Sequence, residues 1–223
     1  MNQPSLYTLP KAPHLMIACV EAGPVATNGY LLADTIKKTG IIIDAPYESL
    51  SVFNAIAEHL QISLAELWLT HSHWDHTADA EHCAARNMNI LIHPADEYRL
   101  QDPMNHTVWP LPFTMAPVQP TRYIQEGDIV SVGDWQLTVI HTPGHTEGGV
   151  CFICHEHDCA FVGDTLFQGS IGRTDLPGGN AEELLQSIQS KLLVLPYEMV
   201  IFPGHGAIST IGEERENNPF LIG

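Results

Sequence analysis

Short apolar runs recur along the chain, and most of them are bounded by glycine, proline, asparagine or aspartate. Runs of this length between turn residues are typical of buried β-strands. They predict strands at residues 15–20, 30–33, 40–44, 67–70, 90–93, 129–132, 136–141, 150–154, 160–162 and 199–202.

Helical periodicity appears where apolar residues recur every three or four positions. It predicts helices over residues 50–60 and 184–192, and a shorter helix over residues 77–87. Because strands predominate and helices lie between them, the pattern favours an α/β fold with much antiparallel pairing and helices packed outside two sheets. At 223 residues and 24.6 kDa the chain suits a single domain spanning residues 1–223.

The net charge of the chain indicates which classes of binding partner to expect. The chain has 26 acidic and 9 basic residues, a formal net charge of −17 and a pI of about 4.9. Nucleic acids and anionic membranes are bound by basic surfaces, so we expect neither as a partner. The apolar runs are also too short to cross a bilayer.

The cysteines and the N-terminal residues bear on the cellular compartment. The five cysteines are an odd number in a chain large enough to fold without disulfides. Residues 1–11 contain no basic run followed by an apolar core, so we predict no secretory leader. We therefore expect reduced thiols in a cytoplasmic protein, while the oligomeric state stays open.

One long segment, residues 102–120, fits neither a helix nor a strand because of its prolines. It contains Trp109 and Phe113. Long irregular loops often border functional sites, so we expect this loop to shape the mouth of a pocket. The alternative is a proline-rich loop that packs on the surface.

Potential metal ligands gather directly after the apolar residues 67–69. His71, His73, Asp75 and His76 fall within six residues. Alternate spacing at the end of an extended strand would project positions 71, 73 and 75 to one side. Imidazole and carboxylate groups are good ligands for zinc, iron and manganese, so the cluster predicts a metal site.

Three later strands end in the same way, with a turn followed by a ligand-type side chain. His145 follows the turn at Pro143 and Gly144, Asp164 follows Gly163, and His205 follows Gly204. Active sites are commonly built on loops at one edge of a sheet scaffold. This repetition predicts that the later residues join the first cluster.

In their order and surroundings these residues resemble the metallo-β-lactamase fold superfamily, and more narrowly the type II glyoxalases (hydroxyacylglutathione hydrolases) in their short bacterial form. The resemblance extends from about residue 26 to the end of the chain. It rests on the motifs His71-Ser-His73-Trp-Asp75-His76, Thr142-Pro-Gly-His-Thr146, Gly163-Asp-Thr-Leu-Phe167, Gly169-Ser-Ile-Gly-Arg173-Thr-Asp, Pro203-Gly-His-Gly, Ile211-Gly-Glu-Glu-Arg and Asn218-Pro-Phe-Leu.

The resemblance implies an αβ/βα four-layer sandwich with two divalent metal ions at one edge. Zinc is expected first, with iron or manganese as the alternatives. Asp44 matches a family acid that orients the 71–76 loop from behind the ligands. The implied ligands are His71, His73 and His145 for the first ion, Asp75, His76 and His205 for the second, and Asp164 as the bridge between them.

This ligand set implies a hydrolase in which a water shared by the two ions supplies the nucleophile. A single zinc ion already lowers the pKa of bound water to about 7. Asp75 and Asp164 are the predicted catalytic residues, and a hydroxide beside them would attack an acyl carbonyl. A thioester suits this chemistry, because a thiol with a pKa of about 8.5 departs without a strong acid.

The resemblance further implies S-lactoylglutathione or a related acyl thioester as the small-molecule substrate. Arg173 aligns with a basic position that contacts glutathione, so it is predicted to bind substrate; an ion pair with Asp175 is the structural alternative. Soon after Asn218 the chain ends, without the basic helical region by which full-length type II glyoxalases hold glutathione. A different acyl thioester therefore stays open.

Other functions remain as alternatives. A persulfide dioxygenase of the same fold would bind one iron through His71, His145 and Asp164. A metal-dependent lactonase or a metal-binding protein without turnover would use the same residues.

The segment Cys151-Phe-Ile-Cys154-His155 satisfies a haem-attachment pattern, and His157 with Cys159 suggests a weak zinc site. Because the segment lies within an apolar strand pattern, we predict ordinary buried cysteines instead.

Overall fold

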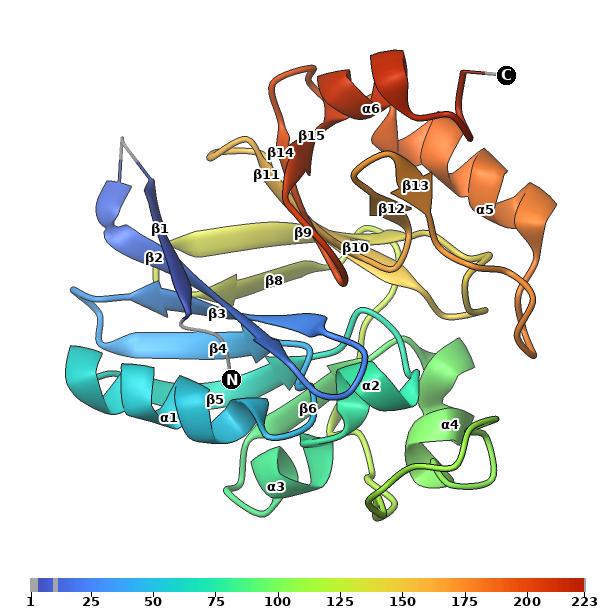
Figure 1. Ribbon diagram of the computed structural model, residues 1–223. Coiled ribbons are helices and arrows are strands. Elements are labelled where there is room, and N and C mark those ends of the chain that lie inside the picture. Colours follow the sequence, from blue (N-terminus) through green and yellow to red (C-terminus); the bar gives the residue numbers. More distant parts are fainter. Residues whose placement is uncertain (1–3, 10–11, 223) are drawn as a thin grey trace.

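Two β-sheets lie face to face, and helices cover the outer face of each (Figure 1). The chain is described by a computed structural model in which residues 4–9 and 12–222 are placed. The prediction about a leader therefore falls partly on residues 1–3 and 10–11, which lie outside the described residues. The arrangement is the predicted αβ/βα sandwich.

The first sheet has seven strands in sequence order. The first four strands pair antiparallel, and the last four, from the fourth strand on, pair parallel. They are β1 (Ser5–Leu9), β2 (Ala12–Ala22), β3 (Thr27–Asp34), β4 (Thr39–Ile43), β5 (Ser63–Trp68), β6 (Asn89–Ile92) and β7 (Arg122–Tyr123).

The second sheet has six strands in the order β15-β14-β11-β10-β9-β8, and only the pair β11 and β14 is parallel. A separate hairpin lies in the chain between β11 and β14. The strands are β8 (Ile129–Val132), β9 (Trp135–His141), β10 (Val150–Cys154), β11 (Cys159–Gly163), β12 (Leu166–Phe167), β13 (Ser170–Ile171), β14 (Val200–Pro203) and β15 (Ser209–Thr210).

The helices are short apart from the first. A 3-10 turn, Pro94–Asp96, precedes α4, and a π-helical turn, Ile188–Leu192, continues α5. The helices are α1 (Ser49–Leu60), α2 (Trp74–Thr77), α3 (Ala80–Ala84), α4 (Glu97–Gln101), α5 (Ala181–Ser187) and α6 (Ile211–Asn217). None of the described helices is long and apolar enough to cross a membrane.

Three apolar clusters hold these layers together. One fills the space between the sheets, one lies between the first sheet and α1 with α3, and one lies between the second sheet and α5 with α6. Alternation along β10 shows the principle: Phe152 enters the central cluster, whereas Ile153 enters the outer one. Because both faces of the inner strands are buried, their sequences read as continuous apolar runs.

The predicted strands are all present, and so are the helices near residues 50–60 and 184–192. The helix predicted over residues 77–87 is present as α3 but spans only Ala80–Ala84, because the chain turns at residues 78–79 and again at residues 85–87. At the first of these turns the Asp79 amide donates to the Ala45 carbonyl (2.9 Å), and the Asp79 carboxylate accepts the Leu50 amide at the start of α1 (2.8 Å). Because the Asp79 backbone and side chain bond to residues outside the 77–87 segment, the helix does not continue through this position.

Substitution of Phe161 tests the packing of the central core. Its ring stacks on Phe202 (centroids 5.1 Å apart) and makes an edge contact with Tyr30. We expect Phe161→Ala to lower the free energy of unfolding by about 3–5 kcal/mol, because it opens a cavity between the sheets. Urea denaturation followed by circular dichroism measures this change. Phe220→Ala, at an exposed ring, serves as the matched control and should change stability by less than about 0.5 kcal/mol. Equal effects of the two substitutions would contradict the assignment.

Candidate metal centre

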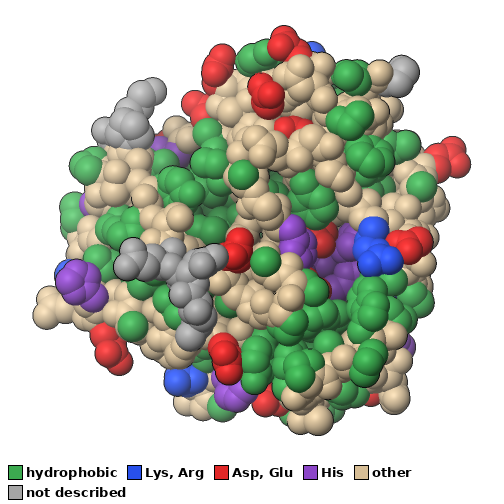
Figure 2. All heavy atoms as spheres, in the orientation of Figure 1, with side chains coloured by type: hydrophobic (Ala, Val, Ile, Leu, Met, Phe, Trp, Pro, Cys, Tyr) green, Lys and Arg blue, Asp and Glu red, His purple; other side chains and the backbone are tan. Residues whose placement is uncertain are grey.

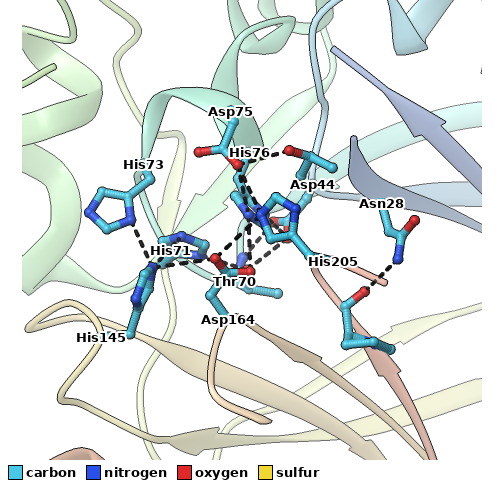
Figure 3. A network of polar contacts seen from close by, with 12 residues as sticks. Asn28, Asp44, Thr70, His71, His73, Asp75, His76, His145, Asp164 and His205 are labelled. Carbon is cyan, nitrogen blue, oxygen red and sulfur yellow. Dashed lines mark hydrogen bonds and ion pairs between the residues drawn. The ribbon is translucent and has the colours of Figure 1, made fainter. Parts of the chain in front are cut away.

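The predicted ligands come from four separate segments at one edge of the two sheets (Figure 3). The first segment runs from the loop after β5, which supplies two histidines, into α2, which supplies an aspartate and a histidine. The segments after β9, β11 and β14 supply one ligand each. In chain order these residues are His71, His73, Asp75, His76, His145, Asp164 and His205. The structure brings all seven together.

Three histidines form the first group of converging donors. His145 Nε2 lies 2.8 Å from His73 Nδ1 and 3.2 Å from His71 Nε2. Three imidazole nitrogens this close, from two loops far apart in the sequence, make a site for one cation.

The second group consists of Asp75, His76 and His205. Asp75 Oδ2 lies 3.2 Å from His205 Nε2 and 3.4 Å from His76 Nε2. Asp75 belongs to α2, so the expectation that it extends from a strand in line with His71 and His73 was wrong. The first turn of α2 instead carries it to the second group.

Asp164 lies between the two groups. Its Oδ2 atom is 3.5 Å from both His145 Nε2 and His205 Nε2, and its Oδ1 atom is 3.3 Å from His76 Nε2. Two of these atoms, His76 Nε2 and Asp164 Oδ1, are buried and form no hydrogen bond to any of the described residues. Buried polar atoms are rarely left so, and a bound cation would satisfy both of them. The donor set therefore fits a pair of divalent ions that share Asp164.

Asp44 orients two ligands from behind. Its carboxylate accepts the Thr70 amide (2.8 Å) and hydroxyl (2.7 Å), and it lies 2.8 Å from His76 Nδ1. The Thr70 hydroxyl in turn lies 3.1 Å from His71 Nδ1. Both rings are thereby held with Nε2 toward the centre, as predicted for Asp44. Its φ of 58° is a strained conformation for a residue other than glycine, of the kind that clusters at functional sites.

Other ligands are held by groups that the sequence did not single out. The Thr27 hydroxyl donates to Asp75 Oδ2 (2.8 Å), and His145 Nδ1 donates to the carbonyl of Arg173 (2.7 Å). These contacts fix ring and carboxylate orientations. Backbone carbonyls and single hydroxyls leave no pattern in a sequence, so these contacts could not be predicted from it.

Asp96 joins two ligand-bearing loops and was also missed. Its fully buried carboxylate accepts the Ser72 amide (2.8 Å), the Thr146 hydroxyl (2.9 Å) and the Gly148 amide (2.7 Å). Ser72 lies between two ligands and Thr146 follows a third. An isolated aspartate after a predicted strand carries too little signal to be recognised.

Cross-sheet contacts position the loop that bears His205. Asn28 Nδ2 donates to the carbonyls of Pro203 (3.1 Å) and Gly206 (2.9 Å). Gly204 approaches the centre so closely that a Cβ atom there would lie 2.2 Å from Asp164 Oδ1. Only glycine fits at this position.

Opposing charges determine the protonation of the metal-free centre. Burial opposes a charge on His205, but the adjacent carboxylates of Asp164 and Asp75 raise its pKa to about 10. Burial likewise opposes ionisation of Asp75, yet His76 and His205 lower its pKa to about 2. In the first group, burial and then repulsion from His145 lower the pKa of His73 to about 3. The second group therefore holds protons that cations would displace.

A pocket of about 360 Å³ opens beside the centre and includes His73, Asp75, His145, Asp164 and His205 in its wall. Figure 2 shows this hollow, with histidines visible inside it and hydrophobic side chains along its border. The irregular loop supplies residues 109–112, so its predicted place at the pocket mouth is confirmed for Trp109. Phe113 does not line the pocket and instead stacks on Tyr47, with ring centroids 3.9 Å apart.

Arg173 lines the pocket but is already paired. Its Nε and Nη2 atoms each donate to Asp175 at 2.7 Å, which is the alternative that the sequence left open. Binding of substrate by Arg173 stays a prediction.

The cysteines are free thiols. Cys154 and Cys159 lie opposite each other in the register of the β10–β11 hairpin and form no disulfide. Among the described residues, His157 forms no three-residue cluster of metal-ligating atoms with them. The ring of His157 packs on Trp135.

Comparison with known proteins supports the same family. The sequence profile described as "Metallo-beta-lactamase superfamily" matches residues 22–205. The hydroxyacylglutathione hydrolase GloC of Haemophilus influenzae is 38% identical over 189 residues, which cover 83% of this chain and 88% of GloC.

Three solved structures are similar in fold. The BLEG-1 B3 metallo-beta-lactamase has a TM-score of 0.83 and 32% identity, and the match covers 93% of this chain and all of BLEG-1. TTHA1623 in a di-iron-bound form has a TM-score of 0.79 and 33% identity, with 91% of this chain and 99% of TTHA1623 covered. ETHE1 from Myxococcus xanthus has a TM-score of 0.73 and 27% identity, with 91% and 83% covered.

Metal uptake should release protons. Because the pKa of His205 is raised to about 10, its imidazole carries a proton below that pH, and a cation binds only the neutral ring. The apparent affinity for Zn²⁺ should therefore rise with pH up to about 10, by about tenfold per pH unit for each proton released. Titration calorimetry in buffers of different ionisation enthalpy counts these protons.

The substitution His205→Gln should reduce the number of protons released, whereas His155→Gln, at an exposed hairpin residue, should not. Heats that are independent of the buffer would contradict the assignment.

Proposed function

The chain belongs to the metallo-beta-lactamase superfamily, and we propose that it is a metal-dependent thioester hydrolase of the glyoxalase II type. Its substrate would be S-lactoylglutathione or a related small acyl thioester. The observation that carries the proposal is the position of Asp164 between two complete three-residue donor groups.

The first ion would be held by His71, His73 and His145, and the second by Asp75, His76 and His205, with Asp164 shared. Such ions supply Lewis acidity toward an acyl carbonyl and lower the pKa of water toward neutrality. Imidazole and carboxylate donors suit zinc, iron and manganese alike, and zinc is our first expectation.

The chain's own residues would hold and orient the reactants. Asp75 and Asp164 both line the pocket, and the low pKa of Asp75 keeps it ionised, so that it accepts a hydrogen bond from water there. Thr27 fixes Asp75 through Oδ2, and Arg173 fixes His145 through its carbonyl. Preorganisation of this kind avoids the cost of reorienting dipoles during the reaction. Arg173 also lines the pocket, where it is proposed to contact the bound substrate.

The leaving group favours a thioester. Among the described residues that line the pocket, every titratable side chain either belongs to the ligand set or, like Arg173, is ion-paired. A strong proton donor for the leaving group is therefore not evident, and a thiolate needs none because a thiol has a pKa of about 8.5. The alkoxide released from a lactone is far more basic, so a lactonase is less well supported.

A dioxygenase with one iron on His71, His145 and Asp164 would leave the second donor group idle. His76 Nε2 is buried beside two carboxylates but forms no hydrogen bond to the described residues, and a second ion is the simplest way to satisfy it. This atom favours the dinuclear hydrolase. We propose that the enzyme acts in the cytoplasm, with no nucleic acid or membrane partner.

Asp164→Asn should abolish most hydrolysis of S-lactoylglutathione, by at least about 100-fold in kcat/KM, because the amide loses the charge shared by both sites. The assay follows loss of the thioester absorbance with zinc-loaded protein. The matched control is Asp158→Asn, in an exposed hairpin turn where asparagine tolerates the positive φ. Equal activity of both variants would overturn the assigned role.

Metal analysis of protein purified without added metal separates the hydrolase from the dioxygenase. We expect about two metal ions per chain and no oxygen uptake in the presence of glutathione persulfide. About one iron per chain together with oxygen consumption at an electrode would instead establish the dioxygenase.

A further inference from the structure

The pocket wall beyond the candidate ligands is apolar. Residues 109–112 of the proline-rich loop line it, together with Val25 and Leu176. Trp109 and Val25 remain about half exposed, at 43% and 47%, so a bound substrate would bury apolar surface on both side chains. A volume of about 360 Å³ lies at the lower end of the range for small-molecule sites. The wall is suited to a compact apolar group.

The cationic side chain at this pocket is not free to hold an anion. Arg173 is the only lysine or arginine among the described residues that line the pocket, and both of its bonds to Asp175 measure 2.7 Å. Its guanidinium carbon lies 5.2 Å from the ring centre of Trp109, so its face is covered as well. A substrate carboxylate would have to displace Asp175.

The groove next to the pocket adds a carboxylate and, among the described residues, no lysine or arginine. This groove shares Pro24 with the pocket and has Glu48 in its wall. A glutathione conjugate carries two carboxylates, and neither finds an unpaired lysine or arginine among the described residues that line the pocket or this groove. Like charges close together raise the free energy of the complex.

We propose that the site selects acyl thioesters by an apolar acyl group held against Trp109, Leu111 and Val25. This inference rests on the proposed thioester hydrolase function. Arg173 then serves as part of the wall and as the support of His145, and it does not clamp a substrate carboxylate. Each additional methylene buried on this wall should improve kcat/KM about three- to fourfold.

The test compares S-acetyl-, S-butanoyl- and S-hexanoyl-N-acetylcysteamine with S-lactoylglutathione, using the metal-loaded protein. The first three share one uncharged thiol, so only the acyl group changes. We expect kcat/KM to rise about tenfold for each two carbons and the hexanoyl ester to exceed S-lactoylglutathione. A flat series, or a preference for S-lactoylglutathione, would overturn the inference.

Variants identify the residues responsible. Trp109→Ala should raise KM for the hexanoyl ester about tenfold more than KM for the acetyl ester, whereas Trp109→Phe should retain the preference. Phe220→Ala removes an exposed ring that does not line the pocket and should change neither. An equal change for both esters in Trp109→Ala would overturn the role of the wall.

Asp175→Asn tests whether the ion pair with Asp175 keeps Arg173 from binding a substrate carboxylate. It should free the guanidinium and lower KM for S-lactoylglutathione several-fold, without altering KM for the uncharged hexanoyl ester. An unchanged KM for S-lactoylglutathione would show that the ion pair does not restrain Arg173, contrary to the inference.

Binding provides a readout that does not depend on turnover. S-hexyl-N-acetylcysteamine, a thioether that cannot be hydrolysed, should bind more tightly than the S-ethyl compound in calorimetry, and Trp109→Ala should remove the difference. Absence of turnover with every thioester would refute the proposed function, whereas turnover without any acyl preference would refute only this inference.

Discussion

Five imidazoles and two carboxylates meet at one edge of the sheets, and the rest of the site depends on this unfavourable arrangement. Burial penalises charge on His76 and Asp164, and each retains a buried polar atom that forms no hydrogen bond to the described residues. Bound cations would repay these costs. Without ions, folding of the rest of the chain has to hold the groups in place, and buried hydrogen bonds rather than the ligands themselves do this.

Two buried aspartates provide most of that support. Asp44 fixes the start of the first ligand loop through Thr70 and reaches His76 directly, while Asp96 ties the same loop to the segment that bears His145. Each carboxylate accepts several donors, so loss of one would leave buried amides unsatisfied. The loops that carry the ligands are thus held by buried hydrogen bonds.

Much of the fold could be predicted because its strands are buried on both faces. The runs around β4 and β10 are continuous and apolar for that reason, and α1 has a clear helical period. Strands as short as β7 and β12 bury too few side chains to leave a pattern. The break after α2 arises from the hydrogen bonds of Asp79 to α1, which are tertiary contacts and not a local preference. The ligands were recognisable from motifs, whereas Asp96 lies outside every motif and the carbonyl of Arg173 would be present with any side chain at that position.

The charge distribution indicates that different groups would recognise the reacting carbonyl and the rest of the substrate. The chain is strongly acidic, and the two arginines near the centre are both paired: Arg173 with Asp175, and the buried Arg99 with Glu147 at 2.7 Å. Surface charges beyond about 8–10 Å are screened, so the positive potential inside the pocket has to come from the ions themselves. Attraction of the reacting carbonyl would then be separate from recognition of the remaining substrate. The remaining substrate meets a wall of proline, leucine, valine and tryptophan, where shape and the burial of apolar surface, and not charge, determine what is held.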